Sequence, residues 1–120
     1  MKIEVTGLKG WYTVKFSDTE ITIPKKILRV LEDFKVKGFE ASVCQQDEFW
    51  YLEMIPDSKK QGTFYTIRNG RMGIPKEIKD SLRIEETGFL VGISDKLELW
   101  GPYWEKYRKQ LEKISIPDLY

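Results

Sequence analysis

The sequence contains no histidine, and its charged residues do not form any obvious catalytic set. Histidine is the commonest general base, the usual partner of a catalytic nucleophile and the commonest transition-metal ligand, so its absence argues against an enzyme. The adjacent carboxylates Glu85-Glu86 and Asp47-Glu48 lie in polar, turn-like segments, where solvated side chains are the expected state. We therefore expect a protein that is not an enzyme and that uses no cofactor or metal.

The sequence is also poor in cysteine and in long apolar runs. Its one cysteine, Cys44, cannot form an internal disulfide and lies in a strand-like segment, which predicts a buried thiol. No window approaches the roughly 18 apolar residues of a membrane span, and the start of the chain has no apolar region of signal-peptide type. These absences predict a cytoplasmic location and no membrane partner.

The 120 residues are 41% hydrophobic and 32% charged, which is typical of a folded chain that forms one domain. An Ile-Pro dipeptide occurs twice, and the segment that begins at Ile23 is repeated 51 positions later. Five of its nine residues are identical in the second copy: Ile23, Pro24, Lys25, Ile27 and Leu31. The sequence therefore contains an internal duplication.

Each Ile-Pro dipeptide is expected to start a short helix, because proline at the first helical position loses no hydrogen bond. The first helix should begin near Pro24 and bury Ile27, Leu31 and Phe34, and the second should begin at Pro75 and end near Arg83. Strand-like segments flank both helices in pairs separated by turns: Lys2–Val5 with Trp11–Phe16 around Gly7 and Gly10, Phe39–Cys44 with Phe49–Met54, Phe64–Ile67 with Arg71–Ile74 around Asn69-Gly70, and Phe89–Ile93 with Leu97–Leu99. Each copy is thus expected to contain strand, strand, helix, strand, strand.

The second copy resembles the AbrB, MazE and MraZ group of swapped-hairpin DNA-binding domains. The matching positions, in order, are Gly70-Arg71, Met72, Ile74-Pro75, Ile78, Leu82-Arg83-Ile84, Asp95 and Leu97–Leu99. Two positions depart from the family pattern: the acidic residue often found shortly before Gly-Arg is absent, and Arg83 stands where glycine is usual. The first copy carries Thr19-Glu20 in place of Gly-Arg.

The resemblance implies a mainly β protein with short helices, of the α+β class, in which two swapped-hairpin units share one core. One such unit exposes an apolar face that it must bury against another, so two copies in one chain predict an intramolecular pseudo-dimeric barrel with core residues Ile23, Ile74, Val43 and Val91. We expect a single domain over 1–120, with repeats over 1–55 and 63–101 and a helix over 102–114. Tandem copies are the arrangement of the MraZ branch.

The C-terminal helix is predicted by apolar residues spaced three, four and three apart, namely Trp104, Tyr107, Leu111 and Ile114. Its apolar stripe is expected to pack on the chain's own barrel or to dock a second protomer, and the resemblance to MraZ proteins favours a homo-oligomer. The mixed charges of its polar side argue against membrane binding.

Basic residues are concentrated in the two repeated strand-to-helix segments. Residues 9–29 and 68–83 each carry a net charge of +3, and because the whole chain carries +1 the remainder carries −5. This distribution is expected when two equivalent edges face one polyanion, and it indicates double-stranded DNA as the partner. The candidate DNA-binding residues are Arg68, Arg71, Lys76, Lys79, Lys15, Lys25, Lys26 and Arg29.

Arg68 and Arg71 flank the Asn-Gly turn, from which guanidinium groups can reach phosphates or a guanine edge. The lysines, with Arg29, lie in or beside the helices and suit phosphate contacts. In the family, basic residues at the Gly-Arg position and on the short helix contact DNA, which implies that role for Arg71 and Lys79.

The leading hypothesis is a sequence-specific, nucleoid-associated DNA-binding transcriptional regulator. One alternative is an antitoxin-like module that binds both DNA and a protein toxin. Another is an interaction or structural protein that kept the fold without DNA binding, which solvent-facing aromatics at Trp11, Trp50 and Trp104 would favour. All three classes leave a protein partner open.

Overall fold

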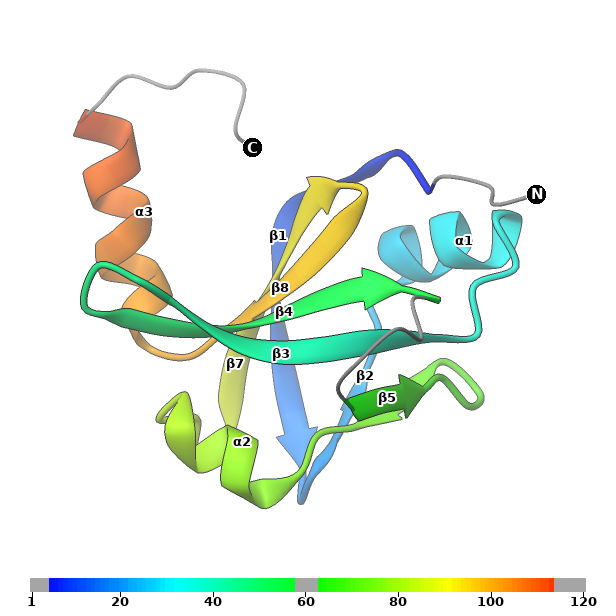
Figure 1. Ribbon diagram of the computed structural model, residues 1–120, viewed down its shortest axis with the longest axis horizontal. Helices are drawn as coiled ribbons and strands as arrows, with labels where there is room; N and C mark the ends of the chain where they lie inside the picture. Colours follow the sequence, from blue (N-terminus) through cyan, green and yellow to red (C-terminus); the bar gives the residue numbers. More distant parts are fainter. Residues whose placement is uncertain (1–4, 58–62, 114–120) are drawn as a thin grey trace.

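The computed structural model describes residues 5–57 and 63–113, with side chains described as far as residue 110 (Figure 1). In these residues the chain forms eight strands and three helices. The first half contains β1 (Leu8–Ser17), β2 (Glu20–Thr22), α1 (Lys25–Asp33), β3 (Gly38–Gln46) and β4 (Phe49–Pro56). The second half contains β5 (Thr63–Thr66), β6 (Arg71–Gly73), α2 (Lys76–Ser81), β7 (Thr87–Ser94) and β8 (Lys96–Trp100), and α3 (Tyr103–Lys113) follows it.

The strands form one antiparallel sheet in the order β5-β3-β4-β8-β7-β1-β2-β6. Its two edge strands, β5 and β6, are consecutive in the chain and are joined through a tight turn in which Arg68 and Arg71 exchange backbone hydrogen bonds. The sheet therefore curls into a nearly closed barrel, with α1 and α2 at different sides of it and α3 on the outside (Figure 1).

Strand pairing crosses between the two halves. The first strand of each half pairs with the third strand of the other, as β1 with β7 and β5 with β3. The second strands pair with each other, as do the fourth, in β2–β6 and β4–β8. This exchange confirms the predicted swapped-hairpin arrangement, in which one chain forms its own pseudo-dimer.

Both Ile-Pro dipeptides start helices, although each proline is the N-cap residue and not, as predicted, the first residue of the helix. Pro24 and Pro75 are the N-caps of α1 and α2, with φ of −55° and −56° and extended ψ of 141° and 146°. The Pro24 carbonyl accepts the first helical hydrogen bond from the Leu28 N–H at 2.9 Å, which is the role of an N-cap carbonyl. The fixed φ of proline thus determines the direction in which the chain enters each helix, although the proline itself precedes the helix.

Both helices end without glycine. Lys35 and Arg83 follow the C-cap residues with φ of 56° and 58°, a left-handed conformation that glycine adopts more easily. At each end the next residue donates back across the last turn, from the Val36 N–H to the Leu31 carbonyl and from the Ile84 N–H to the Lys79 carbonyl. This Schellman pattern explains how Arg83 can occupy the usual glycine position.

The barrel interior is a mainly aliphatic core that both halves share. Ile23 and Ile74 are almost fully buried in it, as predicted, and Val43 packs against it while partly exposed. Val91 is also buried, but it belongs to a separate cluster on the outer face of the sheet, so its assignment to the barrel core was wrong. Both faces of β7 are covered, with Leu90 inside and Val91 outside, and therefore strand alternation alone could not identify the inner face.

The outer cluster is aromatic and lies under α3. Trp100 stacks between Tyr51 and Tyr107, with ring centroids 4.8 and 4.7 Å away, and Trp104 is 1% exposed. Trp104 and Tyr107 therefore pack on the chain's own sheet, and the expectation that Trp104 faces solvent was wrong. Leu111 and Ile114 lie outside the described side chains.

The predicted hairpin at the start of the chain differs from the structure. A single strand, β1, begins at Leu8 and continues through Gly10 to pair along its length with β7, so the turn expected at Gly7 to Gly10 is absent from this described part. Gly10 has φ of 85° and lies opposite Gly92, and a glycine in a strand interior commonly marks such a bend. Residues 2–4 of the expected first strand lie outside the described residues.

The division into repeats at 1–55 and 63–101 with a helix over 102–114 stays a prediction. Cys44 is half-buried in β3 rather than fully buried, and burial raises the pKa of its thiol. Among the described residues, none of the helices is long and apolar enough to cross a membrane.

Candidate nucleic-acid interface

The short β2–β6 pair lies at the symmetry centre of the barrel. Ile21 and Met72 are directly opposite each other, and they are also equivalent positions under the 51-residue repeat. Both side chains are buried in the barrel, whereas Glu20, Thr22 and Arg71 on alternate positions are exposed. A pseudo-two-fold axis therefore passes through this strand pair, and its outer face is open to solvent.

Two matching hydrogen bonds flank the strand pair. The Ile23 N–H donates to the Gly70 carbonyl at 2.8 Å, and the Ile74 N–H donates to the Thr19 carbonyl at 2.7 Å. Donors and acceptors both differ by 51 positions, so the two bonds are equivalent by the repeat. Each bond joins the turn of one half to the Ile-Pro dipeptide of the other, which holds the two turns at opposite ends of the pair.

The turn of the second half has the geometry that its sequence predicts. Asn69 and Gly70 have φ of 53° and 74°, and the flanking Arg68 and Arg71 exchange backbone hydrogen bonds of 2.8 and 2.9 Å. Two consecutive positive φ values are typical of the hairpin turn that Asn-Gly favours. Both arginine side chains are exposed at its base.

Arg71 has an acidic neighbour across the symmetry axis. Its Nη1 lies 3.7 Å from Oε1 of Glu20, the residue at the equivalent position of the first half. The side chains of Arg71 and Glu20 are 61% and 49% exposed, so solvent screens the pair and it contributes little to stability. The sequence did not predict this contact, because it depends on the register of β2 with β6.

The basic residues of α1 lie beside the Asn-Gly turn. A side chain at Gly70 would place its Cβ 3.2 Å from Cδ2 of Leu28, so the turn rests on α1. Lys25, Lys26 and Arg29 on this helix are all exposed. The structure therefore brings them to the same end of the strand pair as Arg68 and Arg71.

The opposite end carries the basic residues of α2 and β1. Lys79, at the position equivalent to Leu28, donates from Nζ to the Asp18 carbonyl at 2.8 Å and lies over the Phe16 ring at 4.8 Å from its centroid. Lys76 and Lys15 are exposed. Because an ammonium group has three donors, Lys79 can hold the first turn and still present protons to a further acceptor.

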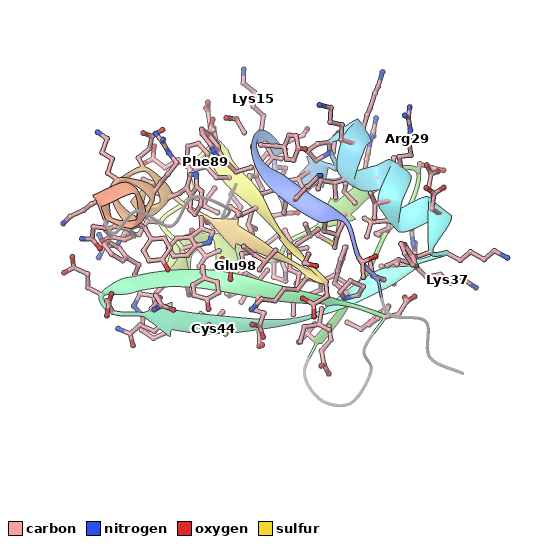
Figure 2. The ribbon with its side chains drawn as sticks, turned by 90° about the horizontal axis from the view of Figure 1, so that it is seen from above. Lys15, Arg29, Lys37, Cys44, Phe89 and Glu98 are labelled. Carbon is pink, nitrogen blue, oxygen red and sulfur yellow. The ribbon has the colours of Figure 1, made fainter. Side chains whose placement is uncertain are left out.

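The eight predicted residues thus form two groups rather than one. Arg68, Arg71, Lys25, Lys26 and Arg29 gather around the Asn-Gly turn, and Lys15, Lys76 and Lys79 gather around the turn at Asp18. Figure 2 shows Lys15 and Arg29, one from each group, projecting from the same side of the molecule, with Cys44 on the opposite side. Lys15 and Arg29 therefore lie on one face, and the two turns beside their groups lie at opposite ends of the exposed β2–β6 pair.

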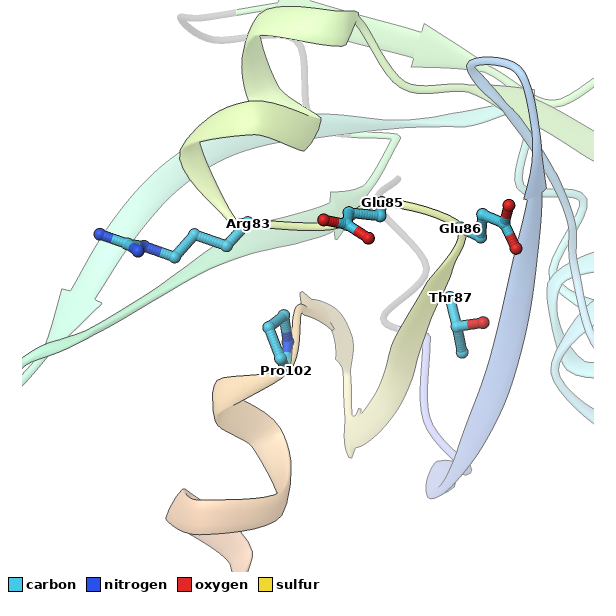
Figure 3. Close-up of a pocket in the computed structure, with 5 residues that line it drawn as sticks. All are labelled: Arg83, Glu85, Glu86, Thr87 and Pro102. Atoms are coloured by element: carbon cyan, nitrogen blue, oxygen red, sulfur yellow. The ribbon is translucent and has the colours of Figure 1, made fainter.

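A further charged feature borders the second group, where Thr87 is the strand partner of Lys15. Arg83, Glu85, Glu86, Thr87 and Pro102 line a pocket of about 460 Å³ between the end of α2 and the start of α3, and Figure 3 shows Arg83 and Glu86 extending to different sides. Its lining mixes both signs of charge and does not continue the basic face. The described residues contain no cluster of three acidic or cysteine side chains that could hold a metal ion.

Sequence reasoning missed one ionisable group, Glu98 on the outer face of β8. Burial beside the aromatic cluster raises the pKa of its carboxyl, although the Trp100 indole N–H donates to it at 2.9 Å. By contrast, Glu85-Glu86 and Asp47-Glu48 are exposed, as predicted. Alternation in β8 could have shown that Glu98 lies on the face opposite Leu97 and Leu99, but not that α3 covers that face.

No protein-family model matches the sequence. A transcriptional regulator MraZ from Mycoplasma capricolum is 28% identical over 114 aligned residues, which cover 78% of this chain and 86% of the relative. The alignment therefore extends over both halves of the barrel rather than one motif. The chain is therefore similar to an MraZ regulator over most of its length, and its crossed strand pairing agrees with the swapped-hairpin fold of the AbrB, MazE and MraZ group that its sequence resembles.

Proposed function

We propose that the chain is a sequence-specific transcriptional regulator that binds double-stranded DNA with the outer face of the β2–β6 pair. The observation that carries the proposal is the meeting of two exposed arginines, at a rigid turn, with three exposed cations of α1. Arg68 and Arg71 would contact base edges in the major groove, where a guanidinium can donate two hydrogen bonds to guanine. This role places the protein on the nucleoid.

The remaining cations would contact the DNA backbone. Lys25, Lys26 and Arg29 lie beside the arginine turn, whereas Lys76 and Lys15 lie at the other end of the strand pair, and all five are exposed. Contacts of this kind fix the register of a protein on the duplex without reading sequence. The MraZ relative, which is named as a transcriptional regulator, supports the proposal from an independent direction.

The proposal is tested by fluorescence anisotropy with a labelled random-sequence duplex. If about four phosphates are neutralised, affinity should fall by about a hundredfold between about 50 and about 200 mM salt. Lys109→Ala is the control variant, because it removes one exposed cation from α3, away from the proposed face. It should keep the affinity and the salt dependence of the wild-type protein. Absence of binding at the lower salt concentration would contradict the proposal.

A protein-binding role is the second candidate, and Trp50 is the observation that favours it. This side chain on β4 is 42% exposed, which is unusual for an indole of its size. The surface around Trp50 suits contact with a second copy of the chain or with another protein. The antitoxin-like alternative depends on a C-terminal segment whose residues from 114 onward lie outside the described structure.

Light scattering distinguishes the protein-binding alternatives from a DNA-binding monomer. If copies assemble through this surface, Trp50→Ser should lower the mass of the assembly and leave the salt-dependent DNA affinity of each chain nearly unchanged. A wild-type protein that is monomeric at micromolar concentration would contradict self-association through β4.

A further inference from the structure

The two turns that flank the β2–β6 pair are equivalent by the repeat but opposite in charge. Residues 68–71 contain Arg68 and Arg71 and no acidic residue, whereas residues 17–20 contain Asp18 and Glu20 and no basic residue. The turns therefore differ by four charges while occupying symmetric places on one face. A duplex that lies along this face would meet an attractive turn at one end and a repulsive turn at the other.

The difference is concentrated at positions 20 and 71, which lie next to the symmetry axis. Glu20 is opposite Gly73 and Arg71 is opposite Thr22, so the two charged side chains are diagonal neighbours on the outer face. Their charged atoms are 3.7 Å apart. Two arginines would be close together here if the halves had the same residue, and Glu20 instead offers a carboxylate to Arg71 in the absence of DNA.

Lys79, the cation nearest to the acidic turn, already contacts other parts of the protein. The Lys79 ammonium donates to the Asp18 backbone carbonyl and lies over the Phe16 ring, so it stabilises the turn. An ammonium is also a point charge that suits phosphate better than a base edge. Among the described residues, the group at this end consists of the lysines Lys15, Lys76 and Lys79, whereas the other end has a pair of guanidinium groups at its turn.

We propose that the protein recognises DNA in a one-ended manner, with Glu20 as the residue that imposes this asymmetry. Arg68 and Arg71 read bases, whereas the turn at Asp18 and Glu20 repels the duplex and makes only the phosphate contacts of its neighbouring lysines. The DNA element bound by one chain is therefore non-palindromic, despite the pseudo-two-fold fold. Glu20 also competes with DNA for Arg71. This inference rests on the proposed DNA-binding function and specifies its target.

The test is selection from a pool of duplexes with random central sequences, followed by sequencing, with the number of chains per duplex measured by native mass spectrometry. The wild-type protein should enrich one non-palindromic element per bound chain. Glu20→Arg should enrich a second, inverted copy of that element, because both turns then carry an arginine. Glu20→Gln should keep the wild-type element and bind it about two- to fivefold more tightly, since an exposed ion pair has about that strength.

Asp95→Asn is the matched control, because it removes an exposed carboxylate from the turn between β7 and β8 and should change affinity less than Glu20→Gln. A palindromic element for each wild-type chain would overturn the inference, and so would an unchanged affinity of Glu20→Gln. Glu20→Gln decides the question if Glu20→Arg fails to show the wild-type thermal transition. Failure of the wild-type protein to retain any duplex at low salt is a different result, and it would overturn the proposed function itself.

Discussion

The two halves of the chain carry the same Ile-Pro motif but bury their helices to different extents. Helix α1 has nine residues and buries Ile27 and Leu31, whereas α2 has six residues and buries none of them. The residue equivalent to Leu31 is Leu82, which is fully buried just after α2 ends. Each half therefore keeps one fully buried leucine at the end of its helix, Leu31 or Leu82, while the rest of the helix differs.

The surface positions of the two helices differ in chemistry as well. Leu28 of α1 lies against the Asn-Gly turn through an apolar contact, whereas Lys79, its equivalent in α2, holds the turn at Asp18 through a hydrogen bond. The two turns are thus held against their neighbouring helices in different ways. The comparison teaches that the identical residues of the repeat maintain the fold, while the non-identical residues give the two ends of the proposed DNA face their different charges.

The largest expected effects come from truncating the helix anchors. Leu31→Ala and Leu82→Ala should each lower the free energy of unfolding by about 2–5 kcal/mol, because both side chains are essentially fully buried. Ile27→Ala should cost more than Ile78→Ala, since Ile27 is 2% exposed and Ile78 is only partly buried. Urea denaturation of the four variants measures these differences. Equal losses at Ile27 and Ile78 would show that the two helices are anchored alike.

Arg71→Ala should have the next largest effect, and the effect is on binding. A bidentate contact to a base is worth about 1–3 kcal/mol, so the variant should lose that affinity for its preferred duplex and become less selective. Lys79→Ala should instead weaken binding to all duplexes alike and reduce the salt slope by about one. Titrations against selected and random duplexes compare the two, with thermal melting as the control for folding. Negligible losses in both folded variants would show that the basic face does not contact DNA.

Gly70→Ala should have a smaller effect on stability. Gly70 has φ of 74°, a conformation that costs a residue with a side chain about 1–2 kcal/mol, and the added Cβ would lie 3.2 Å from Leu28. Thr19, the equivalent residue of the first turn, already has a side chain and does not have a positive φ, so Thr19→Ala should cost less. Thermal unfolding of both variants measures the difference. A larger loss for Thr19→Ala would mean that the turns do not differ as their backbone angles indicate.

Much of this architecture was predictable because local chemistry and the repeat agreed. Pro24 and Pro75 indicated both helix starts to within one residue, and Asn69-Gly70 indicated the hairpin turn. The duplication, together with the apolar face of each copy, predicted that the two halves would share a core. These features depend on short segments or on a pattern that is visible in the sequence itself.

The remaining features depend on long-range pairing. Val91 could not be assigned to the outer cluster, because both faces of β7 are buried and the cover on one face comes from α3. The contact between Arg71 and Glu20 required the register of β2 with β6, which no local pattern specifies. For the same reason, the eight candidate residues could be named from the sequence, but their separation into two groups at opposite ends of one strand pair could not.

Glu53 and Glu98 provide the last comparison between the halves. They lie opposite each other in the β4–β8 pair, on the outer face of the sheet. Glu53 accepts a hydrogen bond from Lys96 at 2.7 Å, whereas the nearest Lys96 contact of Glu98 is 3.8 Å. Glu98 is more buried than Glu53, and burial raises the pKa of the Glu98 carboxyl. One carboxylate is therefore paired well, and the other is held in an environment that disfavours its charge.

The smallest expected effect is a pH dependence of stability at Glu98. Because its pKa is higher in the folded state than in the unfolded state, the folded protein binds more protons between the two values, so stability should fall as pH rises through that interval. Glu98→Gln should remove this fall and raise the melting temperature at neutral pH, since an amide oxygen can still accept the hydrogen bond from Trp100. Glu53→Gln should instead lower the melting temperature slightly, because it weakens the contact with Lys96. Thermal melts from pH 4 to pH 8 compare the two variants, and a melting temperature of Glu98→Gln that tracks the wild type at every pH would mean that the Glu98 carboxylate is ionised without cost.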